Sequence, residues 1–192
     1  TLIVGVEGRG FVAGAVSVSS GAQLGGSGSI GGIVTIASGG TLAPGNGVGT
    51  LSVNGLVLNE ASILDFELAT PGAPGAGAHD LVEVSNALTL DGQLHIDALS
   101  GFGVGSYTLF QYASLTADSE LLVASGPAGY NYTVDLSTSG EVNLVVSQDG
   151  LQFWNGETTM ADGVVHGGTS RWDASSTNWT DPFGATSATW GA

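Results

Sequence analysis

The chain lacks cysteine and lysine and carries little charge of any kind. Without cysteine, none of its 192 residues can form a disulfide, a thiolate metal site or a thiol nucleophile. Arg9 and Arg171 are the only cationic residues beside 17 acidic ones, and the formal net charge is −15. Because phosphate binding needs a basic face, nucleic acid is excluded as a partner.

Two further absences concern membranes and export signals. The sequence has no run of about 18 apolar residues that could form a membrane-spanning helix. Nor does a basic segment precede Thr1-Leu2-Ile3-Val4 as it would in a signal peptide. We expect both ends of the sequence to lie inside a longer chain.

Helical periodicity is also missing, and this absence indicates the fold class. The composition has 42 % hydrophobic residues and only 10 % charged residues, which is enough apolar surface to fold. Short β-branched and leucine-rich runs recur between glycine, serine, asparagine and proline, as is typical of an all-β protein. We predict strands at residues 15–18, 33–37, 50–53, 63–68, 81–84, 87–90, 93–96, 107–112, 132–136, 141–146 and 151–154.

An internal period of 18 residues indicates how these strands are arranged. Residues 16–24 (VSVSSGAQL) are matched class by class by residues 34–42 (VTIASGGTL). A short repeat of strands and glycine turns is typical of a β-solenoid, in which each coil buries its inward face against its neighbours. The period predicts that Leu24 stacks on Leu42.

The same period predicts that Val16 lies beside Val34, and it also matches Ile30 with Val48. An antiparallel β-sandwich is the alternative, because sandwiches too have strands every 8 to 12 residues. The 18-residue match favours the solenoid.

Several segments resemble the passenger-associated strand repeat of bacterial autotransporters, the type V secreted surface proteins. The most specific is GGTLAPGN at residues 39–46, followed by GTLSV at 49–53. Residues 80–84, 88–94 and 105–110 fit the same family, and LQFWNG at 151–156 resembles the start of another repeat block.

This resemblance implies a right-handed, single-stranded parallel β-helix that is a fragment of a longer passenger. Residues 1–147 would form its coils, with a Pro/Gly-rich excursion loop near 70–78, and residues 148–192 would begin a further, truncated block. Family members are displayed on the outside of Gram-negative bacteria after crossing the outer membrane through their own C-terminal translocator barrel, which is absent from this sequence. They serve as adhesins, self-association factors, toxins or proteases.

The sequence offers no catalytic, cofactor or metal motif. The segment GGSGS at 25–29 has glycine where a serine protease motif needs aspartate, and it also lacks the aspartate of the calcium-binding nonapeptide, so we interpret it as a turn. The densest acidic cluster is Asp65, Glu67, Asp80 and Glu83. Such acids are either a solvated strand face or the site of a carbohydrate-active enzyme of the β-helix class.

The second candidate surface is aromatic. Trp154, Trp172 and Trp179 lie near Asp173 in the last 40 residues, a mixture that can stack against sugar rings. The alternative is that each tryptophan closes a core poor in other large side chains. Trp154, Trp172 and Trp190 also follow each other at intervals of 18.

The function predicted from these features is a non-catalytic surface scaffold for adhesion or self-association, with a host-cell receptor, a bacterial-surface receptor or carbohydrate as partner. The alternative is the carbohydrate-active enzyme. An enzyme should bring acids with perturbed pKa values together in a cleft, whereas a scaffold should have flat faces.

Overall fold

All regular secondary structure in the described part of the chain is β-strand. The computed structural model describes residues 1–5, 9–72, 78–117, 121–148, 152–169, 175–180, 183–184 and 186–190. Within these ranges there is no helix of the length and apolarity that spanning a membrane requires. The strands are β1 (Leu2–Ile3), β2 (Phe11–Val12), β3 (Val16–Val18), β4 (Gln23–Gly26), β5 (Ser29–Ile36), β6 (Thr41–Pro44), β7 (Thr50–Leu58), β8 (Ile63–Leu68), β9 (Leu81–Leu90), β10 (Gln93–Ala98), β11 (Gly105–Ala117), β12 (Leu122–Ser125), β13 (Asn131–Asp135), β14 (Glu141–Ser147), β15 (Phe153–Trp154) and β16 (Trp179–Thr180).

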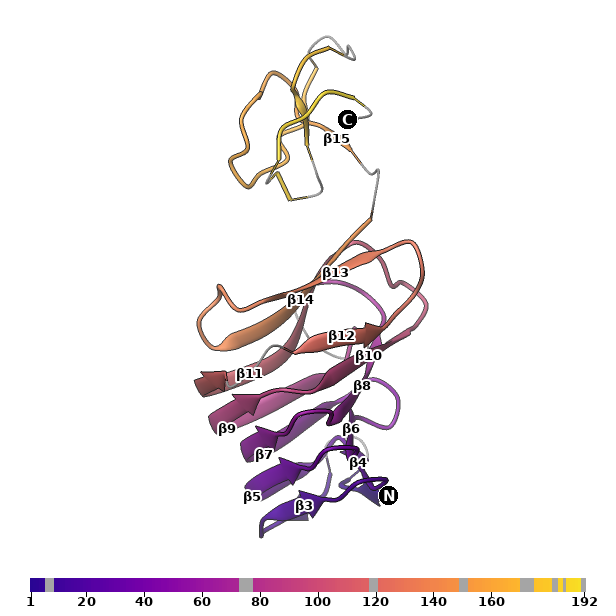
Figure 1. The fold of residues 1–192 in the computed structure, drawn as a ribbon, viewed down its shortest axis with the longest axis vertical. Helices are drawn as coiled ribbons and strands as arrows, with labels where there is room; N and C mark the ends of the chain where they lie inside the picture. The colour runs from indigo at the N-terminus through magenta and orange to yellow at the C-terminus, as the bar shows by residue number, and fades with distance from the viewer. Residues whose placement is uncertain are drawn as a thin grey trace. The chain divides into compact units, whose positions relative to one another are not determined.

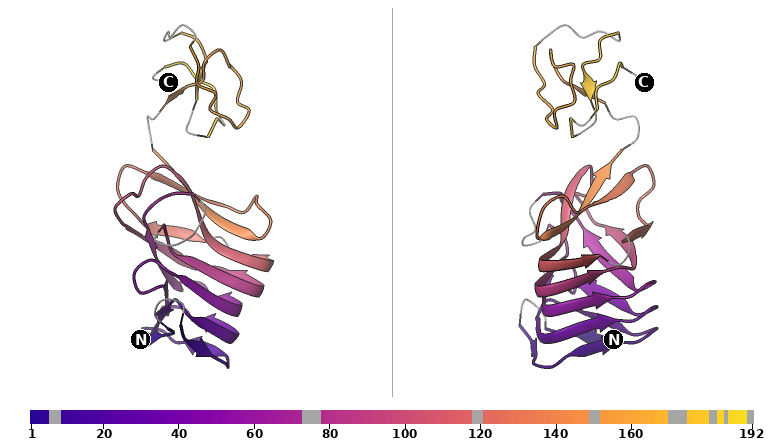
Figure 2. Two further views of the ribbon diagram at one scale, coloured as in Figure 1. Left: turned by 180° about the vertical axis from the view of Figure 1, so that it is seen from behind. Right: turned by 60° about the vertical axis from the view of Figure 1, so that its left-hand side comes forward.

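The chain divides into two compact units, and the first contains two sheets. The first unit comprises residues 1–128 and 132–146, and the second comprises residues 129–131 and 147–192. A six-stranded sheet has the order β1-β4-β6-β8-β10-β12. An eight-stranded sheet has the order β13-β14-β11-β9-β7-β5-β2, with β3 also paired to β5. Figure 1 shows the strands of each sheet lying one above another, and Figure 2 shows the same layers from two other sides.

From β4 to β12 the chain passes back and forth between the two sheets, so neighbours within a sheet are never consecutive in sequence. The strand pairs of the six-stranded sheet are parallel, for example β4 with β6 and β8 with β10. In the other sheet β5, β7, β9 and β11 also pair in parallel. A β-sandwich is antiparallel, so this alternative is wrong.

The predicted stacking of the first repeat is confirmed. Leu24 is the register partner of Leu42, and Val16 is that of Val34. Leu24, Leu42 and Val34 have no exposed surface, while Val16 is half-buried. The apolar column continues through successive layers as Leu42, Leu64, Leu94 and Val123.

The period itself does not persist, and one predicted match is wrong. Ile30 pairs with Val53 and not with Val48, because residues 45–49 form an added turn between β6 and β7. Later layers are longer still, since the loop after β8 and the turn after β10 add residues outside the strands. The strands keep a common register while the connections vary in length.

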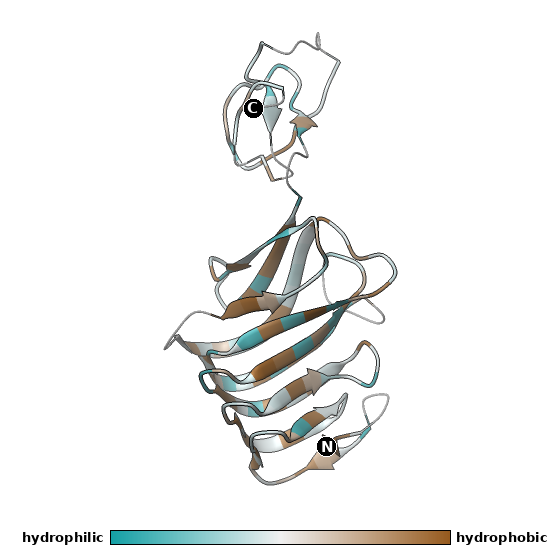
Figure 3. Ribbon diagram, turned by 45° about the vertical axis from the view of Figure 1, so that its right-hand side comes forward, coloured by the Kyte–Doolittle hydropathy of each residue, from teal (hydrophilic) through white to brown (hydrophobic). Residues whose placement is uncertain are grey.

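The long strands of the eight-stranded sheet bend at one level. Residues 81–84 and 87–90 were predicted as separate strands, but they form the single strand β9. The pairing register shifts between Ile30 and Ile33 in β5, and between Val53 and Leu56 in β7. At these bends the alternation of buried and exposed residues is interrupted. The residues there are Gly31 and Gly32 in β5 and Asn54 and Gly55 in β7. Figure 3 shows the alternating hydropathy along the straight parts of the strands.

The parallel stack ends in an antiparallel strand. β14 pairs antiparallel with β11, and β13 lies next to β14 in the sheet order. Val142, Leu144 and Val146 of β14 are fully buried. An antiparallel strand covers the last parallel strand, so the edge of β11 is paired along Gly105–Gln111.

The excursion predicted near residues 70–78 leaves the stack between β8 and β9. At its base the N–H groups of Ala69 and Thr70 both donate to the carbonyl oxygen of Ala78. Residues 73–77 lie outside the described ranges. The return of the chain places His79 and Asp80 beside the end of β8.

The second unit has little regular structure in its described residues. β15 and β16 pair antiparallel, with Trp154 opposite Trp179. The assignment of residues 148–192 to a further repeat block stays a prediction.

Candidate functional site

The outer surface of the six-stranded sheet holds an acidic hollow of about 330 Å³. Gly25, which has no side chain, and Ala43 line it from β4 and β6, and Gly45, Asn46 and Gly47 line it from the turn after β6. Its lining residues are Ile3, Gln23, Gly25, Ala43, Pro44, Gly45, Asn46, Gly47, Asp65, Glu67, Asp80 and Asp97. Four of these are carboxylic acids, and no arginine lines the hollow in the described part of the chain.

Asp80 ties three segments together at the edge of this hollow. Its Oδ1 accepts the N–H of Gly49 at 2.8 Å, and its Oδ2 accepts the N–H of Glu67 at 2.8 Å. The residue is 1 % exposed. Burial raises the pKa of Asp80 to about 7, the two N–H donors oppose that rise, and the nearby Glu67 adds to it. Both carboxylate oxygens are therefore engaged in holding the backbone.

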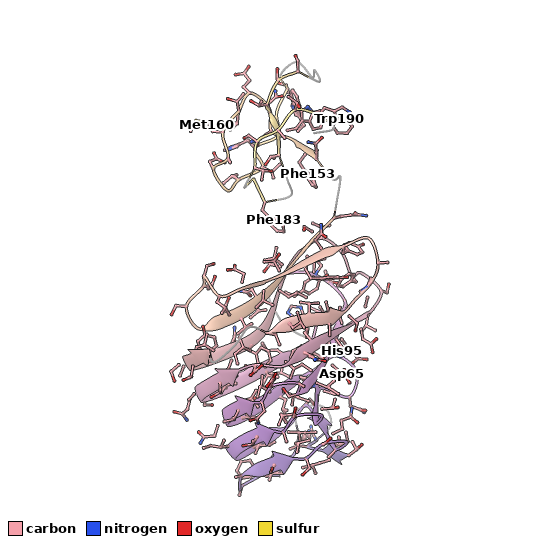
Figure 4. All side chains as sticks on the ribbon, viewed as in Figure 1. Asp65, His95, Phe153, Met160, Phe183 and Trp190 are labelled. Carbon is pink, nitrogen blue, oxygen red and sulfur yellow. The ribbon has the colours of Figure 1, made fainter. Side chains whose placement is uncertain are left out.

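Asp65 faces outward from β8, directly beside β10. Its register partner is His95, and Glu67 is paired in the same way with Asp97. Figure 4 shows Asp65 and His95 next to each other on the two strands. Burial raises the pKa of Asp65, His95 opposes the rise and Asp97 adds to it. The imidazole Nδ1 of His95 lies 2.9 Å from the hydroxyl oxygen of Ser125.

The structure brings together three of the four predicted acids. Asp65, Glu67 and Asp80 line the hollow, whereas Glu83 lies exposed on β9, where it accepts a hydrogen bond from Ser52. Asp97 was missed, because its place opposite Glu67 depends on a register between strands far apart in sequence. The outward orientation of Asp65 and Glu67 follows from the alternation along β8, as predicted.

The hollow meets one criterion set for an enzyme, since its acids converge and two of them have raised pKa values. Its chemistry is nevertheless restricted. Asp80 is the more perturbed acid, and backbone N–H groups occupy both of its oxygens. Among the described residues, no group of three or more histidine, aspartate or glutamate side chains has the geometry to hold a metal ion.

His79 was not singled out by the sequence, and it is almost fully buried at 2 % exposure. Its Nδ1 lies 3.3 Å from the carbonyl oxygen of Thr70 and its Nε2 lies 3.2 Å from that of Thr108. The ring packs edge-on against Tyr107 with centroids 5.4 Å apart. Burial lowers the pKa of His79 despite both carbonyls. These contacts anchor the base of the excursion to β11.

The tryptophan surface is only partly described. Trp172 and Asp173 lie outside the described residues. Trp179 is 7 % exposed and packs edge-on against Trp154 at 5.4 Å between ring centroids. Trp179 also packs against Trp190, with 4.5 Å between the ring centroids. The 18-residue spacing of Trp154, Trp172 and Trp190 stays a prediction, because Trp172 is not described. Trp190, labelled in Figure 4, keeps 48 % of its surface exposed.

Two asparagines near these rings form hydrogen bonds to the backbone of neighbouring loops. Asn155 donates its N–H to the carbonyl of Asn178 at 2.8 Å, and its Oδ1 accepts the N–H of His166 at 2.7 Å. The Nδ2 of Asn178 donates to the carbonyl of Gly156 at 2.8 Å. Asn155 and Asn178 are buried, so their side chains act in the interior of the second unit.

Comparison of the sequence with known proteins identifies the family of the chain. No protein-family model matches the chain. The chain is 38 % identical over 135 residues to a protein described as "Adhesin BmaC autotransporter" from Brucella suis biovar 1 (strain 1330). The match covers 68 % of this chain and 4 % of the much longer relative. This homology and the parallel all-β sheets identify the chain as a passenger region of the autotransporter family.

Proposed function

We propose that this chain is a stretch of a non-catalytic surface scaffold that acts in adhesion or self-association. The observation that carries the proposal is the 38 % identity over 135 residues to an autotransporter adhesin. The regular outward faces of the two sheets support it, because they offer a repeated surface to a partner. The receptor would be a host-cell molecule, a bacterial-surface molecule or a second copy of the scaffold.

The finer architecture that we propose for the first unit is a right-handed, single-stranded parallel β-helix. Two features support it. The chain alternates between two parallel sheets, and one apolar column passes through Leu24, Leu42, Leu64 and Leu94. Each of these leucines has no exposed surface, as expected when every layer completes its core against the next.

The family membership also supports a location outside a Gram-negative cell. We propose that the whole protein is exported to the cell surface and that its own C-terminal translocator barrel is the partner for export. The absence of cysteine fits this route, because no disulfide can lock the chain before it crosses the outer membrane.

The acidic hollow favours a second candidate function, a carbohydrate-active enzyme. Asp65 would be the accessible acid, since Asp80 is buried and holds two backbone N–H groups. The test is release of reducing ends from a panel of acidic and neutral polysaccharides, with Asp65→Asn as the matched control. Release that the control abolishes would establish the enzyme, and its absence from every substrate would favour the scaffold.

Adhesion itself is tested with beads coated with the whole chain. We expect the beads to attach to cultured mammalian cells or to each other, and free chain to compete. Trp190→Ala, at the exposed ring, separates a sugar-binding contribution from one made by the sheets. Folded chain, verified by circular dichroism, that supports neither kind of attachment would contradict the proposal.

A further inference from the structure

Three asparagines of this chain are followed by glycine, and the structure places them in three different environments. They are Asn46, Asn54 and Asn155. Glycine on the C-terminal side leaves the following backbone nitrogen open to approach by the asparagine side chain. The local structure therefore decides which pair can react.

Asn46 is exposed in the turn between β6 and β7, at the rim of the acidic hollow. Within the described ranges no hydrogen bond holds its side chain, and the N–H of Gly47 donates to no backbone carbonyl. Gly47 has a φ of +83° and nothing within 4 Å of the position a Cβ would take. Both reacting groups are free to move.

The other two pairs are held. Asn54 lies within β7, where its Oδ1 accepts a hydrogen bond from Asn86, and Gly55 is paired with Ile33 of β5. Asn155 is 1 % exposed and its Oδ1 accepts the N–H of His166. Reaction at either pair requires local opening of the fold.

We propose that Asn46 is a site of spontaneous deamidation that converts the rim of the acidic hollow to a more negative state. The deprotonated backbone nitrogen of Gly47 attacks Cγ of Asn46, a C–N bond forms, and the side-chain amide leaves as ammonia. Water then opens the five-membered succinimide at either carbonyl. The products are an aspartyl or an isoaspartyl residue, and the net reaction consumes one water and releases one ammonia.

The reaction changes the surface in two ways. It places a fifth carboxylate beside Asp65, Glu67, Asp80 and Asp97, which raises their mutual repulsion. The isoaspartyl product also inserts a methylene into the backbone ahead of Gly49, whose N–H is held by Asp80. The negative charge of this surface therefore increases with the time that has passed since the chain was synthesised.

The test follows the three asparagines in one sample of the whole chain. Folded protein is held at 37 °C and mildly alkaline pH, digested with chymotrypsin because the chain has no lysine, and analysed by mass spectrometry. We expect the increase of one mass unit at Asn46 to appear about tenfold faster than at Asn54 or Asn155, since those two require opening. In concentrated urea the three rates should converge.

Two variants complete the test. Asn46→Gln should remove the early product, and Asn46→Asp should elute with the aged protein on anion exchange. Circular dichroism verifies that the incubated protein stays folded. Equal rates at the three sites in folded protein, or faster reaction at Asn54 or Asn155, would overturn the proposal.

Discussion

At the scale of single residues, Asp80 combines a buried carboxylate with two backbone donors. We expect Asp80→Asn to destabilise the first unit by about 1–3 kcal/mol. Both oxygens of the Asp80 carboxyl group can accept an N–H in either protonation state, whereas the amide has one acceptor and turns its NH₂ toward the N–H of Gly49 or Glu67. Urea unfolding measures the change. Glu83→Gln, on the exposed face of β9, is the control and should stay within about 0.5 kcal/mol of the parent. If the Asp80→Asn variant were as stable as the parent, the two hydrogen bonds to Asp80 would not stabilise the first unit.

The raised pKa of Asp80 also predicts a pH dependence. The folded state keeps the proton of the Asp80 carboxyl group up to about pH 7, whereas the unfolded chain loses it near the ordinary aspartate pKa of 3.8. The free energy that Asp80 contributes to stability is therefore fully present below pH 3.8, its pKa in the unfolded chain. It decreases as the pH rises from there and is lost above about pH 7, its pKa in the fold. Urea unfolding of the parent should show this loss between pH 4 and pH 7, and Asp80→Asn should lack it. If the two N–H bonds outweighed burial, the parent would instead gain stability with pH.

At the scale of elements, one turn position recurs ahead of successive strands of the six-stranded sheet. Gly21, Gly39 and Ala61 occupy it, with φ values of 76°, 75° and 57°. Alanine in this left-handed region is strained. We expect Ala61→Gly to raise the free energy of unfolding by about 0.5–1 kcal/mol, while Ala43→Gly inside β6 should lower it. Thermal unfolding measures the stability of both variants. If Ala61→Gly were less stable than the parent, the backbone of Ala61 would not be strained.

The apolar column makes a second prediction for the elements. Leu42 has no exposed surface and lies between Leu24 and Leu64 in register. We expect Leu42→Ala to cost about 2–5 kcal/mol, because it leaves a cavity between two layers. Thr41→Ala, on the outward side of the same strand, should cost much less. Similar losses for the two variants in urea unfolding would show that β6 does not alternate in this way.

The elements also show how far the sequence could predict the structure. The alternation in β8 and the repeat at residues 16–42 are local patterns, so Leu24 on Leu42 and the outward Asp65 could be predicted. The later layers could not, because turns and the excursion vary in length between strands whose register remains fixed. For the same reason Asp97 and His79, which are placed by partners distant in sequence, were missed.

At the scale of the whole molecule, the proposed scaffold depends on parallel layers of strands that keep a common register in the first unit. The chain has no cysteine, so pairs of cysteines can be introduced and spin-labelled without background. Ile63 and Gln93 face outward and are register partners in β8 and β10. Neighbouring strands lie about 4.8 Å apart, whereas a shift of four residues adds about 13 Å.

The most direct test is therefore electron paramagnetic resonance of the double variant Ile63→Cys with Gln93→Cys. We expect strong dipolar broadening for this pair and clearly weaker broadening for Ile63→Cys on β8 with Asp97→Cys on β10, because Asp97 lies four residues along β10 from the register partner of Ile63. Each single-label variant supplies its unbroadened reference spectrum. Broadening that is absent from the first pair, or equal in the two, would contradict the parallel stack on which the scaffold proposal rests.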